Sequence, residues 1–443
     1  MNYRRRTMIA VLLVLVQSYC YAQKVVDTTA LLTDSASLPN CVQYALAHQP
    51  VIQQSLIDER TTEYQVKNRL ADWYPQVNFN YNLQHNFQVQ TNIINGNPIA
   101  LGVQNTSSGQ FTLSQSLFNR DVLLAYRSRA DVNRQARQTT TSNKIDVAVN
   151  VSKAFYDVLA SMQQIKVAGE DILRLERSLK DARARYESGI ADKTDYKRAM
   201  IALNNTVASR KSSEAALKAN VQYLKSLMGY PTDGELKIEY DSLQMEREVQ
   251  MDTLQRADYK SRIEFSLLET QQRLQQANLK YQKWSFLPSL SANGAYNLNY
   301  FNNKFANLYT NNFPSSFAAL TLTLPIFQGG RRTNNIRIAE WDLTRTNWDI
   351  ANLKNSVSAE YEQAIAGYKS NYASYLALKE NLVAAQEVYD VIQLQYRAGI
   401  KTYLEVITSE TDLRAARFNY ITALYQLLSS KIDVQRALGQ INY

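Results

Sequence analysis

The sequence lacks the residues on which most enzyme active sites depend. It has two histidines in 443 residues, His48 and His85, which lie far apart in the chain. It contains no glycine-rich phosphate loop, no metal-ligand spacing and no Ser/His/Asp grouping. The carboxylates are scattered along predicted helices, where they are usually solvated. We therefore predict a protein that is not an enzyme and that holds no cofactor or metal.

Long apolar runs are also missing. Residues 1–22 have the pattern of a secretory signal peptide, with arginines at positions 4 to 6, an apolar run from Met8 to Val16 and the small residue Ala22 at the cleavage site. Nine apolar residues are too few to span a bilayer. No later segment reaches about eighteen consecutive apolar residues. If the exported chain crosses a membrane, we expect it to do so through β-strands.

Cysteine is equally scarce. Removal of residues 1–22 leaves Cys41 as the only cysteine, so no intramolecular disulfide can form. The same cleavage leaves 46 basic residues against 40 acidic residues. This small excess is spread along predicted helices, and an exported protein rarely meets nucleic acid, so no nucleic-acid partner is predicted.

The few glycines and prolines mark the joints of the chain. There are 13 glycines and 8 prolines, and residues 119–188 and 331–398 each contain one glycine and no proline. Apolar residues at 3-and-4 spacing continue along 151–186, which is typical of a coiled-coil seam. We predict long helices over 119–188 and 331–398, each a rod of roughly 100 Å. Such rods must pack against neighbours of similar length.

Each predicted long helix ends at a glycine. Gly189 and Gly399 stand where a helix needs a left-handed residue to reverse its direction. The chain then returns as a shorter predicted helix, over 194–228 in one case and 402–438 in the other. The sequence therefore predicts two helical hairpins, each with its tip at a glycine.

Alternation of apolar and neutral polar residues predicts β-strands. Over 76–90 most odd positions are apolar and every even position is Asn or Gln. Weaker alternation extends over three further segments, residues 109–118, 289–300 and 317–327. The stretches near 91–108 and 301–316 are rich in Asn and are expected to be loops. We predict two β-hairpins, over about 76–118 and 289–327.

The number of predicted strands requires more than one chain. A strand of about 14 residues, tilted by about 45°, covers some 33 Å and so exceeds the apolar band of an outer membrane. Four strands cannot close a barrel, and open edges in lipid leave backbone groups unpaired. Two chains would supply eight strands, which side chains fill, whereas three chains would supply twelve and leave room for water. A four-stranded sheet resting on a helical body in a soluble protein is the alternative.

The chain repeats one plan of helix, β-hairpin, long helix and return helix. Residues around the turns and helix ends recur at an offset of 210. The matched pairs are Tyr186 with Tyr396, Gly189 with Gly399, Ile190 with Ile400, and Gly229 with Gly439. A period this long indicates a duplicated structural unit. We predict a first repeat over 23–230, a linker over 231–251 and a second repeat over 252–443.

Several motifs occur in an order that resembles the TolC family of outer-membrane channel-tunnels. They are LPNCVQYALAHQP at 38–50, YESGIADKTD at 186–195, LPIFQGGRR at 324–332 and YRAGIKTYLEV at 396–406. Each motif alone is weakly specific, but their order, duplication and spacing make the resemblance strong. It extends from about Leu38 to Gly439.

This resemblance implies a mainly α-helical fold with transmembrane β-strands. It implies a homotrimer whose 12-stranded β-barrel lies in outer-membrane lipid and continues as a 12-helix α-barrel through the periplasm. The linker 231–251 would belong to a small equatorial belt. The implied function is a passive exit duct of a tripartite efflux or type I secretion system. A periplasmic adaptor, and through it an inner-membrane pump, would open the duct at its helical tips.

The resemblance also implies a gate at these tips. Carried over by motif, Asp195 is the acidic partner, and Tyr396 and Lys401 are the donors that hold the periplasmic end shut. The family often has Arg at the place of Lys401, and Lys is a donor without the bidentate geometry of Arg. Glu405 matches the first acid of the family's constriction ring. Thr408 occupies the place of the second, so a double acidic ring is not expected.

The turns themselves are the implied contacts for the adaptor. These residues are Tyr186, Gly189, Ile190, Gly399 and Ile400. A simpler interpretation of the charges near the turns is also open, because acidic side chains favour the first turn of any helix. A trimeric coiled-coil stalk with a structural or adhesive role is the alternative function. The residues do not decide between efflux and protein secretion.

Overall fold

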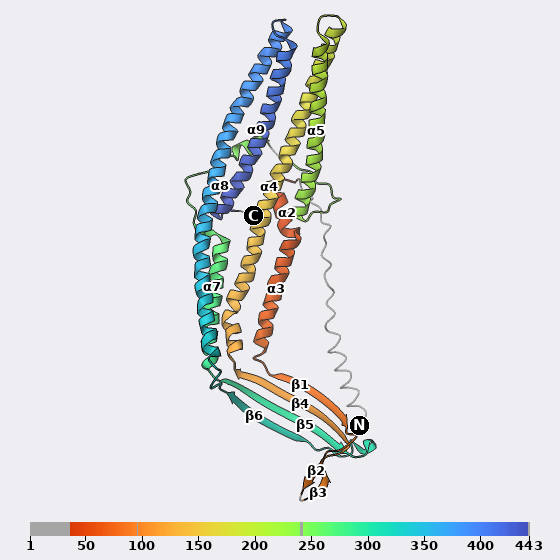
Figure 1. Ribbon diagram of the computed structural model, residues 1–443, viewed down its shortest axis with the longest axis vertical. Coiled ribbons are helices and arrows are strands. Elements are labelled where there is room, and N and C mark those ends of the chain that lie inside the picture. Colours follow the sequence, from red (N-terminus) through yellow and green to blue (C-terminus); the bar gives the residue numbers. More distant parts are fainter. Residues whose placement is uncertain (1–35, 95, 240–241, 442–443) are drawn as a thin grey trace.

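The computed structural model describes residues 36–94, 96–239 and 242–441, so the predicted signal peptide 1–22 lies outside the described residues. The fold is mainly helical, and each half contains a helical segment, two long strands, a very long helix and a shorter helix (Figure 1). The first half comprises α2 (Leu38–His48), α3 (Pro50–Ala71), β1 (Gln76–His85), β4 (Asn105–Phe118), α4 (Arg120–Glu187) and α5 (Lys193–Met228). The second half comprises α7 (Ile263–Lys283), β5 (Ser289–Asn302), β6 (Ser315–Thr323), α8 (Arg331–Arg397) and α9 (Tyr403–Leu438).

Two helical hairpins, α4–α5 and α8–α9, lie side by side at the end of the molecule opposite the sheet (Figure 1). Helices α4 and α8 are 68 and 67 residues long, so each extends about 100 Å. All four helices begin and end within one residue of the positions expected from the sequence. Among the described residues, no helix combines the length and the apolarity that a membrane span requires.

The main hydrophobic core lies where α2, α4, α5, α8 and α9 meet. Its largest fully buried side chains are Phe155, Leu159, Leu224, Met228, Leu427 and Leu428. Val151 and Val158, from the seam predicted on α4, are buried beside Phe155. Each fully buried side chain of this size stabilises the fold by about 1.5–3 kcal/mol. This region therefore holds the two hairpins against each other.

Each return helix ends against the residues that precede the short helix of its own half, which is α3 in the first half and α7 in the second. The Gln49 side chain donates a hydrogen bond to the Leu227 carbonyl at 3.0 Å, next to Gly229, which ends α5 in the left-handed conformation. Ser261 Oγ donates to the Leu438 carbonyl at 2.9 Å at the end of α9. Carbonyls at a helix terminus have no partner within the helix, so both repeats solve this problem in the same way.

The linker 231–251 is fastened to the long helices. Ala36 forms a parallel bridge with Ile238, and the linker then forms the short helix α6 (Ser242–Arg247). The Tyr368 hydroxyl of α8 donates to the Val249 carbonyl at 2.7 Å. Glu246 of α6 receives a hydrogen bond from Lys379 of α8 at 2.9 Å. The linker thus crosses the helices near the main core.

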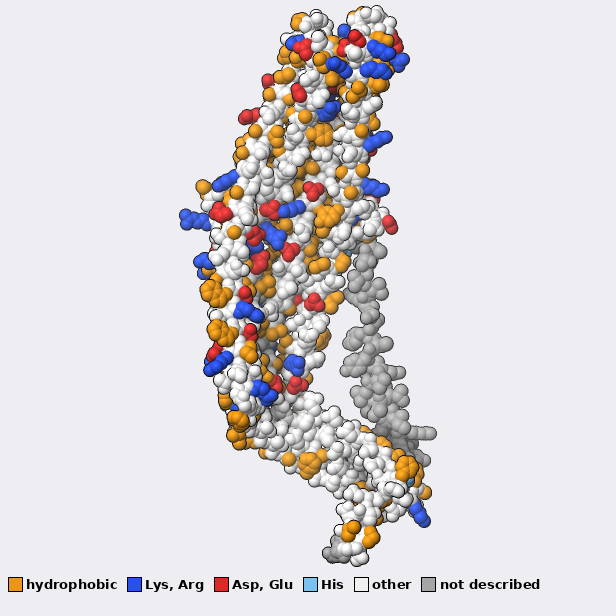
Figure 2. Space-filling view, viewed as in Figure 1, with side chains coloured by type: hydrophobic (Ala, Val, Ile, Leu, Met, Phe, Trp, Pro, Cys, Tyr) orange, Lys and Arg blue, Asp and Glu red, His pale blue; other side chains and the backbone are white. Residues whose placement is uncertain are grey.

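The four long strands form one antiparallel sheet in the order β1-β4-β5-β6. The predicted hairpins are present, and β4 pairs with β5 to join them. The register places apolar residues on one face: Val77 is opposite Leu113, Phe79 is opposite Phe111, and Leu290 is opposite Leu322. Several of these side chains are more than half exposed in the protomer; they are Val77, Phe79, Leu320 and Leu322. Over the strands, the side of the sheet seen in Figure 2 carries few hydrophobic side chains.

Several strand boundaries differ from the prediction. β1 ends at His85, although the alternation continues to residue 90. The predicted loop over 91–108 contains a second hairpin, β2 (Thr91–Ile94) and β3 (Asn97–Ala100), and the start of β4. β6 ends at Thr323 and not at Phe327. Pro325 explains this early end, because proline has no N–H to donate to a neighbouring strand.

We predict that Gly229→Ala destabilises the fold. A Cβ on Gly229 would lie 2.8 Å from the His48 carbonyl oxygen, and φ there is +67°, so the substitution adds a clash to a strained backbone, costing about 1–3 kcal/mol. The melting midpoint measures this change. Gly169→Ala is the matched control, because a Cβ there meets nothing within 4 Å and helix propensity favours Ala. A Gly229→Ala midpoint equal to or above the wild-type value would contradict the interpretation.

Candidate gate at the helical tips

The two hairpin tips have the same backbone geometry. Gly189 and Gly399 have φ values of +75° and +76°. In the first turn the Ile190 N–H donates to the Arg185 carbonyl at 2.9 Å, and in the second the Ile400 N–H donates to the Gln395 carbonyl at 2.9 Å. This 6→1 bond defines a Schellman motif, which satisfies the last carbonyls of the helix. The sequence therefore identified both turns correctly.

The side chains beyond each glycine are free for contact. Ile190 is 74% exposed and Ile400 is 72% exposed. Tyr186 lies one turn before Gly189 and stacks on Tyr196 of the return helix, with ring centroids 6.3 Å apart. Each tip therefore presents one isoleucine on a rigid turn.

Tyr396 lies between the two hairpins. The Arg185 guanidinium of α4 lies 5.0 Å from the centre of its ring, and the Tyr403 ring lies 5.7 Å from it. Burial raises the pKa of Tyr396; the Arg185 charge opposes this and the nearby Asp195 charge adds to it. Asp195, in the first turn of α5, thus lies close enough to Tyr396 to interact electrostatically.

Tyr403 is a tip residue to which the sequence analysis gave no role. Its hydroxyl lies 2.9 Å from Ser178 Oγ of α4, and its side chain is buried with Ala182 and Ala199 in a small hydrophobic cluster. Burial raises the pKa of Tyr403 to about 12. Tyr403 belongs to α9 and its partners belong to α4 and α5, so it connects the two hairpins within one protomer.

Lys401 and Glu405, which were assigned to the gate and to the constriction, pair with each other. Lys401 Nζ lies 2.6 Å from Glu405 Oε1. The other Glu405 oxygen accepts the Thr402 N–H at 2.9 Å, which completes a capping box at the start of α9. The Lys401 hydrogen bond and these cap bonds hold the pKa of Glu405 down to about 2. Glu405 is therefore ionised at any physiological pH.

Thr408 has a purely local partner in the protomer. Its hydroxyl donates to the Leu404 carbonyl of the same helix at 2.9 Å, and its side chain is exposed. The structure therefore brings Asp195 near Tyr396 and joins Lys401 to Glu405, and Thr408 lies one helical turn beyond Glu405.

A buried charged cluster below the tips was missed by the sequence analysis, which treated helical carboxylates as solvated. Asp171 and Arg174 of α4 form an ion pair, and Arg417 of α9 lies 3.3 Å from Asp171. Glu410 of α9 is 4% exposed, and its Oε1 lies 4.0 Å from Arg174 Nε. Glu410 follows Tyr403 and Val406 and precedes Leu413 at 3-and-4 spacing, and this signal would have placed it inside.

Three polar atoms of this charged cluster have no hydrogen-bond partner in the described structure. They are Asp171 Oδ2, Arg174 Nε and Glu410 Oε1. Burial raises the pKa of Glu410 to about 7, although Arg174 opposes the shift; burial also raises the pKa of Asp171. Buried charges without full pairing are costly, so the cluster is a weak point in the contact between the hairpins.

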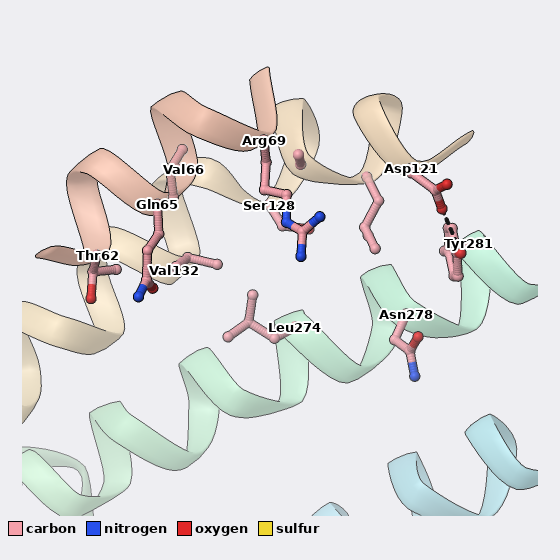
Figure 3. Close-up of a pocket in the computed structure, with 12 residues that line it drawn as sticks. Thr62, Gln65, Val66, Arg69, Asp121, Ser128, Val132, Leu274, Asn278 and Tyr281 are labelled. Atoms are coloured by element: carbon pink, nitrogen blue, oxygen red, sulfur yellow. Dashed lines mark hydrogen bonds between the residues drawn. The ribbon is translucent and has the colours of Figure 1, made fainter. Parts of the chain in front are cut away.

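Two cavities flank the helices at opposite ends. One, of about 460 Å³, lies between α4, α8 and α9 at the tips, and Arg174, Tyr396 and Tyr403 are among its lining residues. The other, of about 600 Å³, lies between α3, α4 and α7 near the sheet, where Tyr281 donates to Asp121 at 2.6 Å (Figure 3). Within the described ranges, no group of three or more His, Cys, Asp or Glu could hold a metal ion.

Comparisons with known proteins decide the family. The family described as Outer membrane efflux protein matches residues 41–230 and 261–440. The chain belongs to this family. Outer membrane protein TolC of Escherichia coli (strain K12) is a relative with 20% identity over 425 residues, 93% of this chain and 84% of TolC.

Solved structures of other membrane proteins have the same fold. A membrane protein from Pseudomonas aeruginosa superimposes with a TM-score of 0.75 at 18% identity, covering 93% of this chain and 95% of that one. The Campylobacter jejuni CmeC outer membrane channel gives a TM-score of 0.73 at 15% identity, covering 93% of this chain and 91% of that one. The predicted TolC-like channel fold is confirmed at this level.

Membership of this family fixes the location and the general role of the protein. It is a TolC-family efflux channel of the outer membrane. The family consists of channel proteins and not of enzymes. The alternative of an adhesive stalk is not favoured.

We predict that Glu410→Gln stabilises the protein at high pH only. Because the pKa of Glu410 is raised in the folded state, the protonated side chain contributes stability that is fully present below the unfolded-state pKa, about 4.5. This stability is lost as the pH rises through about 7. Gln resembles the protonated acid, so the variant should match the wild type at pH 4 and melt roughly 1–3 °C higher at pH 8. Glu214→Gln, at an exposed ion pair, is the control. Equal midpoints for Glu410→Gln and the wild type at pH 8 would refute this role.

Proposed function

We propose that three copies of this chain assemble into a passive outer-membrane exit duct. The observation that carries this proposal is the sheet. Its apolar face is exposed, and in the described parts of the chain the outer edges of β1 and β6 have no neighbouring strand. Backbone groups at an open edge in lipid remain unpaired, and twelve strands from three chains would pair both edges around a lumen wide enough for water.

The helical hairpins continue this duct into the periplasm. Each protomer has two hairpins of two helices each, so three protomers supply twelve helices around the same axis. We assign the constriction to the tips, where the turns of the two hairpins converge in each protomer. The exposed isoleucines Ile190 and Ile400, with Tyr186, Gly189 and Gly399, form the surface that we assign to a periplasmic adaptor, and the adaptor links the duct to an energised inner-membrane pump.

The closed state depends on polar contacts at the tips. We assign Asp195, Tyr396 and Lys401 to these contacts, because Asp195 already lies near Tyr396 within one protomer. In the protomer Lys401 binds Glu405, so a latch to a neighbouring chain must exchange this partner or share it. Glu405 forms the acidic ring of the constriction, and its depressed pKa keeps three carboxylates ionised in a trimer.

The gate is tested by Asp195→Ala combined with Lys401→Ala. Removal of both charges from the closed tips should raise the single-channel conductance in planar bilayers severalfold. The matched control is Arg210→Ala with Glu214→Ala, which removes an ion pair from α5 away from the tip. Wild-type conductance in the tip variant would mean that these residues do not hold the channel shut.

The constriction ring is tested by Glu405→Gln. Gln at this position can keep the capping box but removes three charges per trimer, so the preference for cations in reversal-potential measurements should disappear. Thr408→Asp adds an acid one turn further along and should strengthen that preference. If Glu405→Gln channels still prefer cations, the selective ring lies elsewhere in the duct.

A further inference from the structure

A basic cavity lies where the strands meet the long helices. It has a volume of about 440 Å³ and lies between the start of α4, the start of β5 and the segment that joins β6 to α8. Three arginines line it: Arg120, Arg331 and Arg332. Asp121 is an acidic residue of the lining, and it accepts a hydrogen bond from Tyr281. The cavity therefore carries an excess of positive charge.

Arg332 and Arg120 are held in place, but the hydrogen-bonding capacity of Arg120 is not used up. Arg332 is 9% exposed; its guanidinium donates to the Pro325 carbonyl and lies 4.8 Å from the centre of the Phe286 ring. Arg120 lies 4.4 Å from the centre of the Tyr281 ring, and its buried Nη1 has no hydrogen-bond partner in the described structure. A buried guanidinium nitrogen without an acceptor is costly, and an anion in the cavity would supply that acceptor.

The start of α8 adds to this positive potential. The residue before its first turn is Gly330, which has no side chain to accept a hydrogen bond from the turn. The corresponding position before α4 is Asn119, whose side chain accepts the Asp121 N–H at 2.8 Å. The N-terminus of a long helix carries a partial positive charge and favours anions. At the start of α8, Gly330 provides no side chain to cap this partial positive charge.

The rim of the cavity is apolar. Phe118 lines the cavity and lies opposite Leu290 in the register, so it belongs to the apolar face of the sheet. Leu287, also in the lining, is 46% exposed. In the segment between β6 and α8, Ile326 is 91% exposed and Phe327 is 87% exposed. The apolar band of the strands thus continues to the edge of a pocket with three arginines.

We propose that this cavity binds the phosphate of a membrane phospholipid in the periplasmic leaflet, with preference for a headgroup of net negative charge such as phosphatidylglycerol. Guanidinium groups bind phosphate oxygens in a bidentate manner, and the apolar rim accommodates the acyl chains. A headgroup with an ammonium group would be repelled by the excess of arginines. The inference rests on the proposed function, because the site needs the strands to lie in the membrane.

The test is lipid retention by the full-length protein in a neutral detergent. The purified protein is mixed with equal amounts of phosphatidylglycerol and phosphatidylethanolamine, and retained lipids are counted by native mass spectrometry. We expect the wild type to prefer phosphatidylglycerol. Arg120→Gln with Arg331→Gln should lower this preference by about fivefold for each arginine removed. Arg332 is left intact, since it holds the Pro325 carbonyl.

Two further variants keep the result interpretable. Arg210→Gln with Arg345→Gln removes the same charge at exposed positions away from the cavity and should leave the preference unchanged. Arg120→Lys with Arg331→Lys keeps the charge without the bidentate geometry and should give an intermediate preference. Unchanged melting midpoints in detergent alone would show that all these variants fold. Equal retention by the wild type and the double Gln variant would overturn the proposed site.

Further experiments distinguish a lipid phosphate from a free phosphate, and a failure of this site from a failure of the proposed duct. If inorganic phosphate displaces phosphatidylglycerol at an equal concentration, the acyl chains add nothing to binding, the cavity binds a free anion and the lipid assignment is wrong. Flotation with vesicles of phosphatidylethanolamine alone tests membrane insertion without an anionic headgroup. Protein that inserts but shows no lipid preference contradicts the site alone, whereas protein that floats with no vesicle contradicts the proposed membrane duct.

Discussion

The pairing of backbone groups at the two edges of one sheet is the constraint on which the proposed assembly depends. Within the described residues the sheet ends at β1 on one side and β6 on the other. Its apolar face suits lipid, yet an unpaired strand edge does not. No rearrangement of four strands closes a barrel of this strand length, so further copies of the chain must supply the missing neighbours. The trimer is the smallest assembly that also leaves a wet lumen.

In the proposed duct the helical half meets a different requirement, which is to stay shut and still be able to open. The main core, with Phe155 and Leu427, joins the hairpins firmly at mid-length. Towards the tips the contacts become polar: Tyr403 meets Ser178, and Arg174 lies between Asp171 and Glu410. Incompletely paired buried charges weaken a contact that apolar side chains would strengthen. The distribution of side chains therefore places the rigid part in the middle and the adjustable part at the tips.

Much of this architecture is predictable because it depends on local pattern and repetition. The tip glycines, the helix bounds and the hairpins followed from spacing that the chain contains twice, as with Gly189 and Gly399. Features that depend on tertiary context were not predictable. The pairing of β4 with β5 joins the two halves of the chain, and no sequence period encodes it. The short hairpin β2–β3 and the pairing of Lys401 with Glu405 are local, but the Asn-rich composition and the family resemblance indicated other roles for these residues. The burial of Glu410 was indicated by its 3-and-4 spacing with Val406 and Leu413, whereas its approach to Arg174 of the opposite hairpin was not.

Electron microscopy of the detergent-solubilised protein is the most direct test of the central claim. The proposed trimer should be a three-fold, tapered, hollow cylinder about 135 Å long, from roughly 100 Å of helix and about 33 Å of strand. Continuous density around the sheet region would show that β1 of one protomer pairs with β6 of the next. A monomer with a free sheet, or a solid rod without a lumen, would contradict the proposed duct.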